Sequence, residues 1–302
     1  MLEFLPLKPE DKPEIDRYLL HCGSRGCEYS FANLFMWGRQ RATFYKGFLV
    51  LFSQFNRRSV YPYPIGRGDR KAALDAIMED AARRGIPCRI SGLLEEDCRE
   101  LERLYPGQFR IHSDRDGFDY VYAIDDLADL KGRAYQKKRN HVNRFFASYP
   151  DAQLVPMSRE NLAQVEEMCE KWFENRYAVE PNSDFHMEKC ALNRAWGNWE
   201  ALGMEGMTLF VDGQLIAFAM GSRLSIDTFD IHFEKALDVD GAYAAINRGF
   251  ARYLADKYPE VKYLNREDDL GIEGLRKAKL SYLPHHMVEK SWACLLEDGN
   301  DY

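Results

Sequence analysis

Long hydrophobic runs are absent from this chain of 302 residues. No apolar stretch reaches the roughly 18 residues that a membrane-spanning helix needs, which predicts no stable membrane insertion. The first ten residues, Met1 to Glu10, contain no basic start, no long apolar segment and no small-residue cleavage site. We therefore expect no secretory signal peptide and a cytoplasmic location.

Cysteine is also scarce, with seven residues scattered over the whole sequence. An odd number of widely spaced cysteines argues against a disulfide framework and favours reduced thiols in a cytosol. Cys22 and Cys27 have no second cysteine pair nearby, and the pair His285-His286 has no cysteine or carboxylate at ligand spacing. Buried thiols and an exposed histidine pair account for these residues, so we predict no metal site.

Several catalytic motifs are missing as well. The sequence contains no H-E-x-x-H, no Walker-type loop, no G-x-G-x-x-G and no G-x-S-x-G. These absences remove the main sequence support for a zinc protease, a nucleotide hydrolase, a dinucleotide-dependent enzyme or an α/β-hydrolase. The net charge is −7, from 41 basic and 48 acidic residues, which opposes a general coating of nucleic acid or anionic membrane.

The predicted elements follow a similar order in both halves of the chain. A helix pair, antiparallel strands, a helix, a strand, a helix and a final strand form the order of an acetyltransferase-type α+β unit. A length of 302 residues also favours two domains. We therefore predict two tandem acetyltransferase-like (GNAT-like) domains, residues 1–150 and 151–302, each with a mixed, mostly antiparallel sheet flanked by helices.

Local signals support particular elements. Lys46-Gly47 and Asp212-Gly213 predict hairpin turns, because Asp-Gly supplies the positive φ that a tight turn needs. Gly85 is expected to end an amphipathic helix over residues 69–84. A last strand is expected over residues 287–295.

A basic segment interrupts this otherwise acidic chain. Residues 131–150 contain six Lys or Arg residues and no acid, and we predict a linking helix over 131–149 that ends the first domain. At about 100° per residue, apolar side chains fall on one side of that helix and most cations on the other. The apolar side comprises Tyr135, Val142, Phe145, Phe146 and Tyr149.

The polar side of this helix is a candidate phosphate-binding surface. Its cations have no acidic partner at i,i+4 spacing to offset their repulsion, and Lys and Arg suit phosphate oxygens. A pyrophosphate, a tRNA 3′ end and a phospholipid head group all fit this pattern, and a solvated helix surface is the structural alternative. The candidate donor-binding residues are Arg133, Lys137, Lys138, Arg139, Asn140 and Arg144.

A group of carboxylates follows a short predicted strand in the second half. Polar residues just beyond the carboxyl end of a strand commonly face a ligand, and a carboxylate there would take a proton from an attacking amine. Glu267 and Asp269 are the candidate bases, and Asn265 is expected to orient the acceptor. Capping of the following helix is the alternative role for one of the acids. Lys277 and Lys279 suit either anion binding or a solvated helix surface.

The basic and acidic segments together resemble an uncharacterised bacterial family related to the C-terminal catalytic domain of phosphatidylglycerol lysyltransferase. Residues 130–145, 265–282 and 28–37 carry the likeness. Such lysyltransferases and the Fem-type enzymes have two acetyltransferase-like domains and transfer an aminoacyl group from charged tRNA to an amine or hydroxyl. The basic Arg-Asn helix of the Fem-type enzymes is similar to residues 137–140. The resemblance implies a tandem acetyltransferase-like fold and points to aminoacyl transfer.

The sequence departs from acetyl-CoA transferases at the loop whose amides cradle pyrophosphate. The matching stretch, residues 238–243, begins with an acid and adds Asp240, and both carboxylates would repel a diphosphate. In contrast, Ala278-x-x-x-Tyr282 keeps the spacing of the acetyltransferase helix whose tyrosine protonates the leaving group. Tyr282 is therefore the candidate acid, with a place in the core as the alternative.

We therefore expect an acyl or aminoacyl transferase with aminoacyl-tRNA as the preferred donor and acyl-CoA as the alternative donor. The acceptor is expected to be an amine or hydroxyl on a small molecule or a lipid head group. A non-catalytic protein of the same fold that binds an anionic ligand, RNA or phospholipid is the competing hypothesis. Only the enzyme is expected to lose turnover, with binding retained, in Glu267→Gln or Asp269→Asn.

Overall fold

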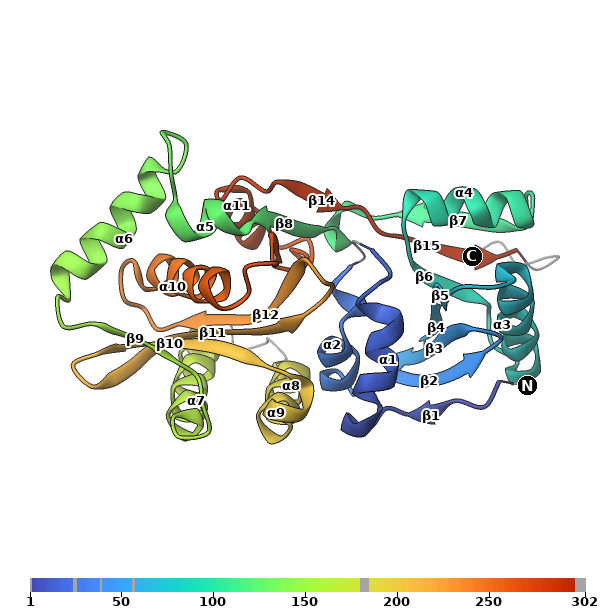
Figure 1. The fold of residues 1–302 in the computed structure, drawn as a ribbon, viewed down its shortest axis with the longest axis horizontal. Coiled ribbons are helices and arrows are strands. Elements are labelled where there is room, and N and C mark those ends of the chain that lie inside the picture. The colour runs from blue at the N-terminus through green and yellow to red at the C-terminus, as the bar shows by residue number, and fades with distance from the viewer. Residues whose placement is uncertain (1, 24–25, 39, 56–57, 180–184, 297–302) are drawn as a thin grey trace.

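The chain forms two mixed β-sheets with helices on both faces of each (Figure 1). The structure is a computed structural model that describes residues 2–23, 26–38, 40–55, 58–179 and 185–296. Each sheet contains one parallel strand pair, and its other pairs are antiparallel. The predicted α+β architecture of two mixed, mostly antiparallel sheets flanked by helices is confirmed.

The first sheet has the strand order β1-β2-β3-β4-β6-β15-β7, with β5 paired to β3. Its strands are β1 (Leu5–Pro6), β2 (Gln40–Tyr45), β3 (Phe48–Phe55), β4 (Arg58–Pro62), β5 (Ile65–Gly66), β6 (Arg89–Leu93), β7 (Phe109–Ser113) and β15 (Ser291–Leu295). The helices of this half are η1 (Pro9–Asp11), α1 (Lys12–Leu19), η2 (Cys27–Tyr29), α2 (Phe31–Met36), α3 (Arg70–Arg84), α4 (Glu95–Leu104) and η3 (Arg115–Gly117).

The second sheet has the strand order β14-β8-β13-β12-β11-β10-β9. Its strands are β8 (Asp119–Ala123), β9 (Gln153–Pro156), β10 (Glu205–Val211), β11 (Gln214–Arg223), β12 (Thr228–Ala236), β13 (Tyr263–Asn265) and β14 (His286–Val288). The helices of this half are α5 (Ile124–Asp129), α6 (Gln136–Ser148), α7 (Leu162–Val179), α8 (His186–Gly197), α9 (Trp199–Leu202), α10 (Ala242–Lys257) and α11 (Glu273–Leu280).

A shared hydrophobic core joins the two sheets. Leu49 and Leu51 of β3 belong to the same buried cluster as Phe218 and Met220 of β11, with α1, α2, α7 and α8 between them. The opposite faces of the sheets pack separately, against α3 and α4 in one half and against α5 and α10 in the other. Each large apolar side chain that is fully buried contributes about 1.5–3 kcal/mol. Separation of the two halves would therefore expose this apolar cluster to water. The same packing holds α2 close to the second sheet.

The predicted turns and the predicted helix cap are confirmed. Lys46-Gly47 and Asp212-Gly213 both adopt positive φ at the tips of their hairpins, as a two-residue turn requires. The Asp69 side chain accepts a hydrogen bond from Ala72 N at the start of α3, and Gly85 ends that helix with φ of 64°. These elements follow from neighbouring residues alone.

The division expected at residue 150 does not separate the two sheets. β8, α5 and α6 precede residue 150 but belong to the second sheet and its core, because β8 pairs with β13 and β14. The single last strand expected over residues 287–295 is wrong. Its first part, β14, pairs in the second sheet, and the chain then crosses to pair as β15 in the first (Figure 1).

The basic linking helix is shorter than expected. α6 begins at Gln136, because residues 131–135 form a turn in which Gly132 has positive φ. The expected apolar side is confirmed, since Val142 and Phe145 are fully buried. Within the described ranges, no helix is both long enough and apolar enough to cross a membrane.

Candidate functional site

The candidate site lies where the parallel strands β12 and β13 separate. They pair only from Thr228–Asp230 to Tyr263–Asn265, while β12 continues to Ala236. Two side-chain pairs span the strands beyond this point. Arg266 Nη2 donates to Glu234 Oε1 at 3.0 Å, and His232 Nδ1 lies 3.2 Å from Glu267 Oε1. Side chains therefore meet here in place of a backbone ladder.

β12 bulges at His232, whose side chain lies on the same face of the strand as that of Asp230 two residues earlier. Met220 pairs with Phe233 and Gly221 with Ile231, which leaves His232 as the extra residue. Bulges re-aim side chains and are common beside active sites. The His232 ring lies between Ser222 Oγ, 2.8 Å from Nε2, and Asp230 Oδ2, 3.4 Å from Nδ1.

Glu267 is held by contacts from both halves of the chain. It has φ of 56°, and its N–H donates to Asn265 Oδ1 at 2.7 Å. Asn33 of α2 donates to Glu267 Oε1 at 3.3 Å. Among the residues that the structure describes, Glu267 Oε2 makes no hydrogen bond, and the side chain is 23% exposed. One carboxylate oxygen is therefore fixed and the other is open to a ligand.

Asn265 is fully buried and serves the scaffold. Besides fixing the backbone of Glu267, it donates to Asp119 Oδ2 at 2.9 Å. Asp119 also accepts from Cys27 N at 2.7 Å and from Lys290 Nζ at 2.6 Å. The structure thus places Asn265 as a positioning residue for Glu267.

Lys290 completes a buried ion cluster at the crossing between the sheets. Its ammonium lies 3.1 Å from Glu28 Oε2 as well as 2.6 Å from Asp119 Oδ1. Burial opposes the charge, but Cys27, Glu28 and Asp119 outweigh it, so the pKa of Lys290 is raised. Burial first, and then Asp119, raises the pKa of the Cys27 thiol, which keeps that thiol protonated and unreactive.

Asp230 is a buried carboxyl group without hydrogen bonds among the described residues. The residue is fully buried, and neither carboxylate oxygen has a hydrogen-bond partner in the described part of the chain. Burial, followed by the charge of Glu267, raises the pKa of Asp230 well above its ordinary value. An unpartnered buried carboxyl is costly, so this position calls for a ligand or a proton.

Asp269 lies outside this cluster, in the loop before α11. Arg276 donates to both of its oxygens at 2.8 Å, Tyr120 OH donates at 2.5 Å and Gly271 N at 2.9 Å. The hydrogen bonds from Arg276 and then from Tyr120 overcome the effect of burial and lower the pKa of Asp269. Its lone pairs are occupied by the loop, which leaves Glu267 as the candidate base.

We expect Asp269→Asn to lower the free energy of unfolding at pH 7 by about 2–3 kcal/mol, the value of hydrogen bonds to a charged group. Because the folded pKa is depressed, this contribution exists above the unfolded pKa of about 4 and disappears as the pH falls toward the folded value. Urea unfolding at pH 7 and at pH 3 measures both effects. Equal stability of variant and wild type at pH 7 would show that these bonds contribute nothing.

The candidate donor-binding residues on and before α6 differ in whether they contact other protein groups or solvent. Arg139 donates to the carbonyls of Leu130 and Gly132, and Arg144 pairs with Asp240 at 2.7 Å. Arg133 lies in the turn before the helix, and Lys137 and Asn140 are exposed on it. Arg139 and Arg144 are thus engaged within the protein, while Lys137 faces solvent.

Lys138 links the basic helix to the separated strands. Its ammonium lies 3.7 Å from the centre of the Tyr282 ring, and the Arg266 guanidinium lies 5.1 Å from the same ring. Burial and then the charge of Arg266 lower the pKa of Lys138 to about 8. Arg266 Nη1 is buried and has no hydrogen-bond partner among the described residues. Arg266 pairs with Glu234 through Nη2 only. Lys138 and Arg266 could therefore bind a further anionic group.

The N-terminus of α10, where the sequence comparison with acetyl-CoA transferases placed the pyrophosphate loop, is covered by α6. Gly241 has φ of 85°, and a Cβ atom there would lie 2.9 Å from Phe145 Cβ and 3.0 Å from His141 O. The adjacent Asp240 pairs with Arg144. Helix α6 therefore fills the space at the N-terminus of α10 in which an anion would bind.

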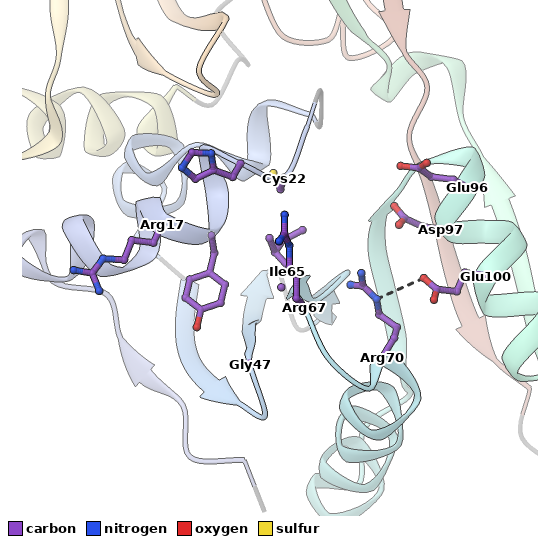
Figure 2. A pocket seen from close by; sticks show the side chains of 12 residues that line it. Arg17, Cys22, Gly47, Ile65, Arg67, Arg70, Glu96, Asp97 and Glu100 are labelled. Carbon is purple, nitrogen blue, oxygen red and sulfur yellow. Dashed lines mark ion pairs between the residues drawn. The ribbon is translucent and has the colours of Figure 1, made fainter.

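A separate cavity of about 640 Å³ lies in the first half, away from this cluster (Figure 2). One wall is basic and the other acidic, and Arg70 pairs with Glu100 across it at 3.5 Å. None of the candidate residues from the sequence lies in it. It is lined by Arg17, Tyr18, His21, Cys22, Gly47, Ile65, Gly66, Arg67, Arg70, Glu96, Asp97 and Glu100.

Sequence reasoning found Glu267 and Asn265 but missed their partners. His232, Asp230, Asp119 and Lys290 come from β12, β8 and the crossing before β15, with no motif to join them. The alternation of acidic and basic side chains on β12, a strand otherwise rich in apolar residues, was the one available signal.

Known proteins give this geometry a context. A crystal structure of a conserved protein of unknown function from Bacteroides thetaiotaomicron is 37% identical and covers 98% of this chain and 100% of its own, with a TM-score of 0.94. The structure of L-PGS from Bacillus licheniformis is 16% identical over 98% of this chain and 94% of its own, with a TM-score of 0.68. A tandem GNAT protein from the clavulanic acid biosynthesis pathway is 10% identical over 99% and 100%, with a TM-score of 0.52.

The tandem acetyltransferase-like fold is thus confirmed by structures of the same two-sheet design. An uncharacterised protein of Mycoplasmoides gallisepticum is 27% identical over 57% of this chain, and the chain spans about half the length of that curated relative. Residues 21–294, which include every residue of the candidate site, match the family described as phosphatidylglycerol lysyltransferase, C-terminal. The chain therefore belongs to the phosphatidylglycerol lysyltransferase C-terminal family.

Proposed function

We propose that this protein transfers an acyl or aminoacyl group from a phosphate-bearing carrier, preferably aminoacyl-tRNA, to an amine or hydroxyl acceptor. The reacting groups meet between β12 and β13, with the carrier on the side of α6. The name of the family supports a lysyl group as one such aminoacyl group and phosphatidylglycerol as one such acceptor. A small-molecule amine is the other class of acceptor.

The observation that carries this proposal is that two cations able to bind an anion lie near a carboxylate oxygen that has no hydrogen-bond partner among the described residues. Lys138 and Arg266 flank Tyr282, and Glu267 follows Arg266 directly in the chain. Arg266 Nη1 offers a free donor, and Glu267 Oε2 offers a free acceptor. Arg266 Nη1 can donate a hydrogen bond to a phosphate oxygen, and Glu267 Oε2 can accept the proton of an attacking amine.

The proposed reaction needs no covalent enzyme intermediate. The acceptor nitrogen or oxygen attacks the ester carbonyl of the donor and gives its proton to Glu267 Oε2. The bond from the carbonyl carbon to the carrier oxygen then breaks, and that oxygen takes a proton from Tyr282. Burial raises the pKa of Tyr282 to about 12, which keeps its hydroxyl protonated at neutral pH. Positioning of the two substrates supplies most of the acceleration.

The covered N-terminus of α10 supports tRNA over acyl-CoA as the donor. A diphosphate at that helix end would meet Asp240 and the backbone of α6. Lys137 instead lies exposed on α6, where a polynucleotide backbone has access, and Lys138 of the same helix reaches inward to the Tyr282 ring. Acyl-CoA remains the alternative donor, and a binding protein without turnover is the alternative class.

We expect the affinity for deacylated tRNA to fall as the pH rises through about 8, because Lys138 then loses its charge. Loss of one charged contact to a phosphate corresponds to roughly tenfold in affinity. Lys138→Arg keeps its charge at every accessible pH, so this variant should bind equally at pH 7 and pH 9. Lys137→Arg is the matched control and should keep the wild-type pH dependence. Filter binding across this range measures both, and a pH-independent wild type would exclude a phosphate contact from Lys138.

Transfer itself is tested with tRNA that carries a radiolabelled aminoacyl group. The labelled tRNA is incubated with the protein and either phosphatidylglycerol vesicles or a mixture of small amines. The proposal predicts movement of label from tRNA to one of these acceptors in proportion to protein concentration. Binding of tRNA without any movement of label would favour the non-catalytic alternative.

A further inference from the structure

Two compact groups of potential metal ligands lie within the described part of the chain. One consists of Cys27, Glu28 and Asp119, and the other of Asp230, His232 and Glu267. In each group the ligand atoms all lie within 4.8 Å of one another. The two groups have the same kind of chemistry, but they differ in whether the protein supplies a cation.

The first group already holds a cation, the ammonium of Lys290. It lies 2.6 Å from Asp119 Oδ1, 3.1 Å from Glu28 Oε2 and 3.9 Å from Cys27 Sγ. Its charge offsets the carboxylates, and its three hydrogens match the three partners. This group therefore needs no metal ion.

The second group contains no such cation among the described residues. Lys279 of α11 donates from its ammonium to the backbone carbonyls of Arg266 and Asp268. Asp230 is fully buried, and both of its oxygens lack a hydrogen-bond partner. A buried carboxylate with no donor is rare because its desolvation is left without compensation. A bound cation removes this cost.

The distances in the second group suit a small tetrahedral ion. His232 Nδ1 lies 3.2 Å from Glu267 Oε1 and 3.4 Å from Asp230 Oδ2. Ligand atoms on a tetrahedral Zn²⁺ ion, at bond lengths of about 2.0–2.2 Å, lie about 3.3–3.6 Å apart. Both distances from the imidazole nitrogen are therefore close to an edge of such a tetrahedron, and all three ligand atoms lie within 4.8 Å of one another.

Ser222 gives this histidine the outer partner that metal-bound histidines generally have. Its hydroxyl lies 2.8 Å from Nε2, and both side chains are buried. When Ser222 Oγ accepts a hydrogen bond from Nε2–H, Nδ1 is unprotonated and its lone pair lies beside two carboxylates. That arrangement is favourable only with a metal ion or a proton among the three atoms.

We propose that Asp230, His232 and Glu267 bind one divalent transition-metal ion, with Zn²⁺ the best match to an imidazole and two carboxylates. The two carboxylates balance the charge of the ion. Glu267 Oε1 is the ligand atom, so Oε2 stays open, and the site is reached from the 23%-exposed side of Glu267. The metal would bind Glu267 Oε1, Asp230 and His232, whereas the proposed transfer step uses Glu267 Oε2, so metal binding is tested separately from transfer.

The test is Zn²⁺ binding to the chelator-stripped full chain, measured by calorimetry and by metal analysis after dialysis. One ion per chain is expected for the wild type. Ser222→Ala should weaken binding by about 10–100-fold, as loss of an outer partner does, and Asp230→Asn and His232→Gln should weaken it further. Glu28→Gln, which removes a carboxylate from the group that Lys290 fills, should bind Zn²⁺ as the wild type does.

Two results of the Zn²⁺ titrations would overturn the proposal. The first is the absence of saturable Zn²⁺ binding in the wild type, and the second is full stoichiometric binding retained by both Asp230→Asn and His232→Gln. A measurement on the wild type alone guards against variants that fail to fold. Co²⁺ in place of Zn²⁺ should give the intense visible absorption of a four-coordinate ion, and the weak spectrum of hydrated Co²⁺ would contradict the site. None of these readouts depends on transferase activity.

Discussion

Glu267→Gln is expected to slow aminoacyl transfer by about 10²–10⁴-fold, the usual contribution of a positioned general base. The amide keeps the size of the side chain and can still contact Asn33, but it cannot accept the proton of the acceptor. Carrier binding at Lys138 and Arg266 should remain within about twofold, since one uncharged group replaces an acid that would repel phosphate. The measurements are initial rates of label transfer and filter binding of the same tRNA.

Two controls make that result specific. Glu273→Gln changes the same chemistry at an exposed position on α11, where the carboxylate pairs with Lys277 in the next turn, and it should leave the rate unchanged. Asp230→Asn removes a proposed metal ligand and keeps the base. A rate in Glu267→Gln equal to that of the wild type would remove Glu267 from the mechanism. An equal loss in Asp230→Asn would assign the effect of Glu267 to the metal site.

Lys290→Met is expected to lower the free energy of unfolding by about 3–5 kcal/mol, the typical cost of breaking a buried ion pair from one side. The loss would leave a buried negative charge uncompensated, because the Asp119 side chain is 0% accessible and no other ammonium of the described residues pairs with it. Asn265 and Cys27 N still donate to it, but neither carries charge. Urea unfolding, followed by tryptophan fluorescence, measures the change.

The matched control for this prediction is Lys277→Met. Its side chain is 75% exposed and pairs with Glu273 on the surface, so the change should stay within about 0.5 kcal/mol. The double variant Lys290→Met/Asp119→Asn removes both charges and should recover part of the lost stability. A loss below about 1 kcal/mol in Lys290→Met would mean that the buried cluster is not held by this ion pair.

The fold was largely predictable because its signals are local. Gly85 and the Asp212-Gly213 turn each act through residues a few positions away, and both behave as expected. The crossing of the chain at Lys290 was not predictable in this way. Residues 286–295 alternate like one strand, and only the competition of β8 and β6 for their backbone groups divides them between the two sheets.

The site was predictable only in part, for the same reason. Glu267 was found because it directly follows a strand, and Lys138 because it belongs to a basic run. The cluster around them joins α2, β8, β12, the loop after β13 and the crossing before β15. Residues so far apart in sequence have no common pattern. Strand alternation predicts only that Asp230 and His232 share a face of β12, not that Glu267 lies beside them.

The central claim is that Lys138 and Arg266 hold the phosphates of an acyl carrier beside Glu267. A thermal-shift comparison of deacylated tRNA with CoA, for the wild type and Lys138→Ala, tests it most directly. A ligand at a hundred times its dissociation constant stabilises a protein by about 2.7 kcal/mol. The account predicts such a shift with tRNA, a clearly smaller one in Lys138→Ala and none with CoA. Stabilisation by CoA alone, or an equal tRNA shift in both proteins, would contradict it.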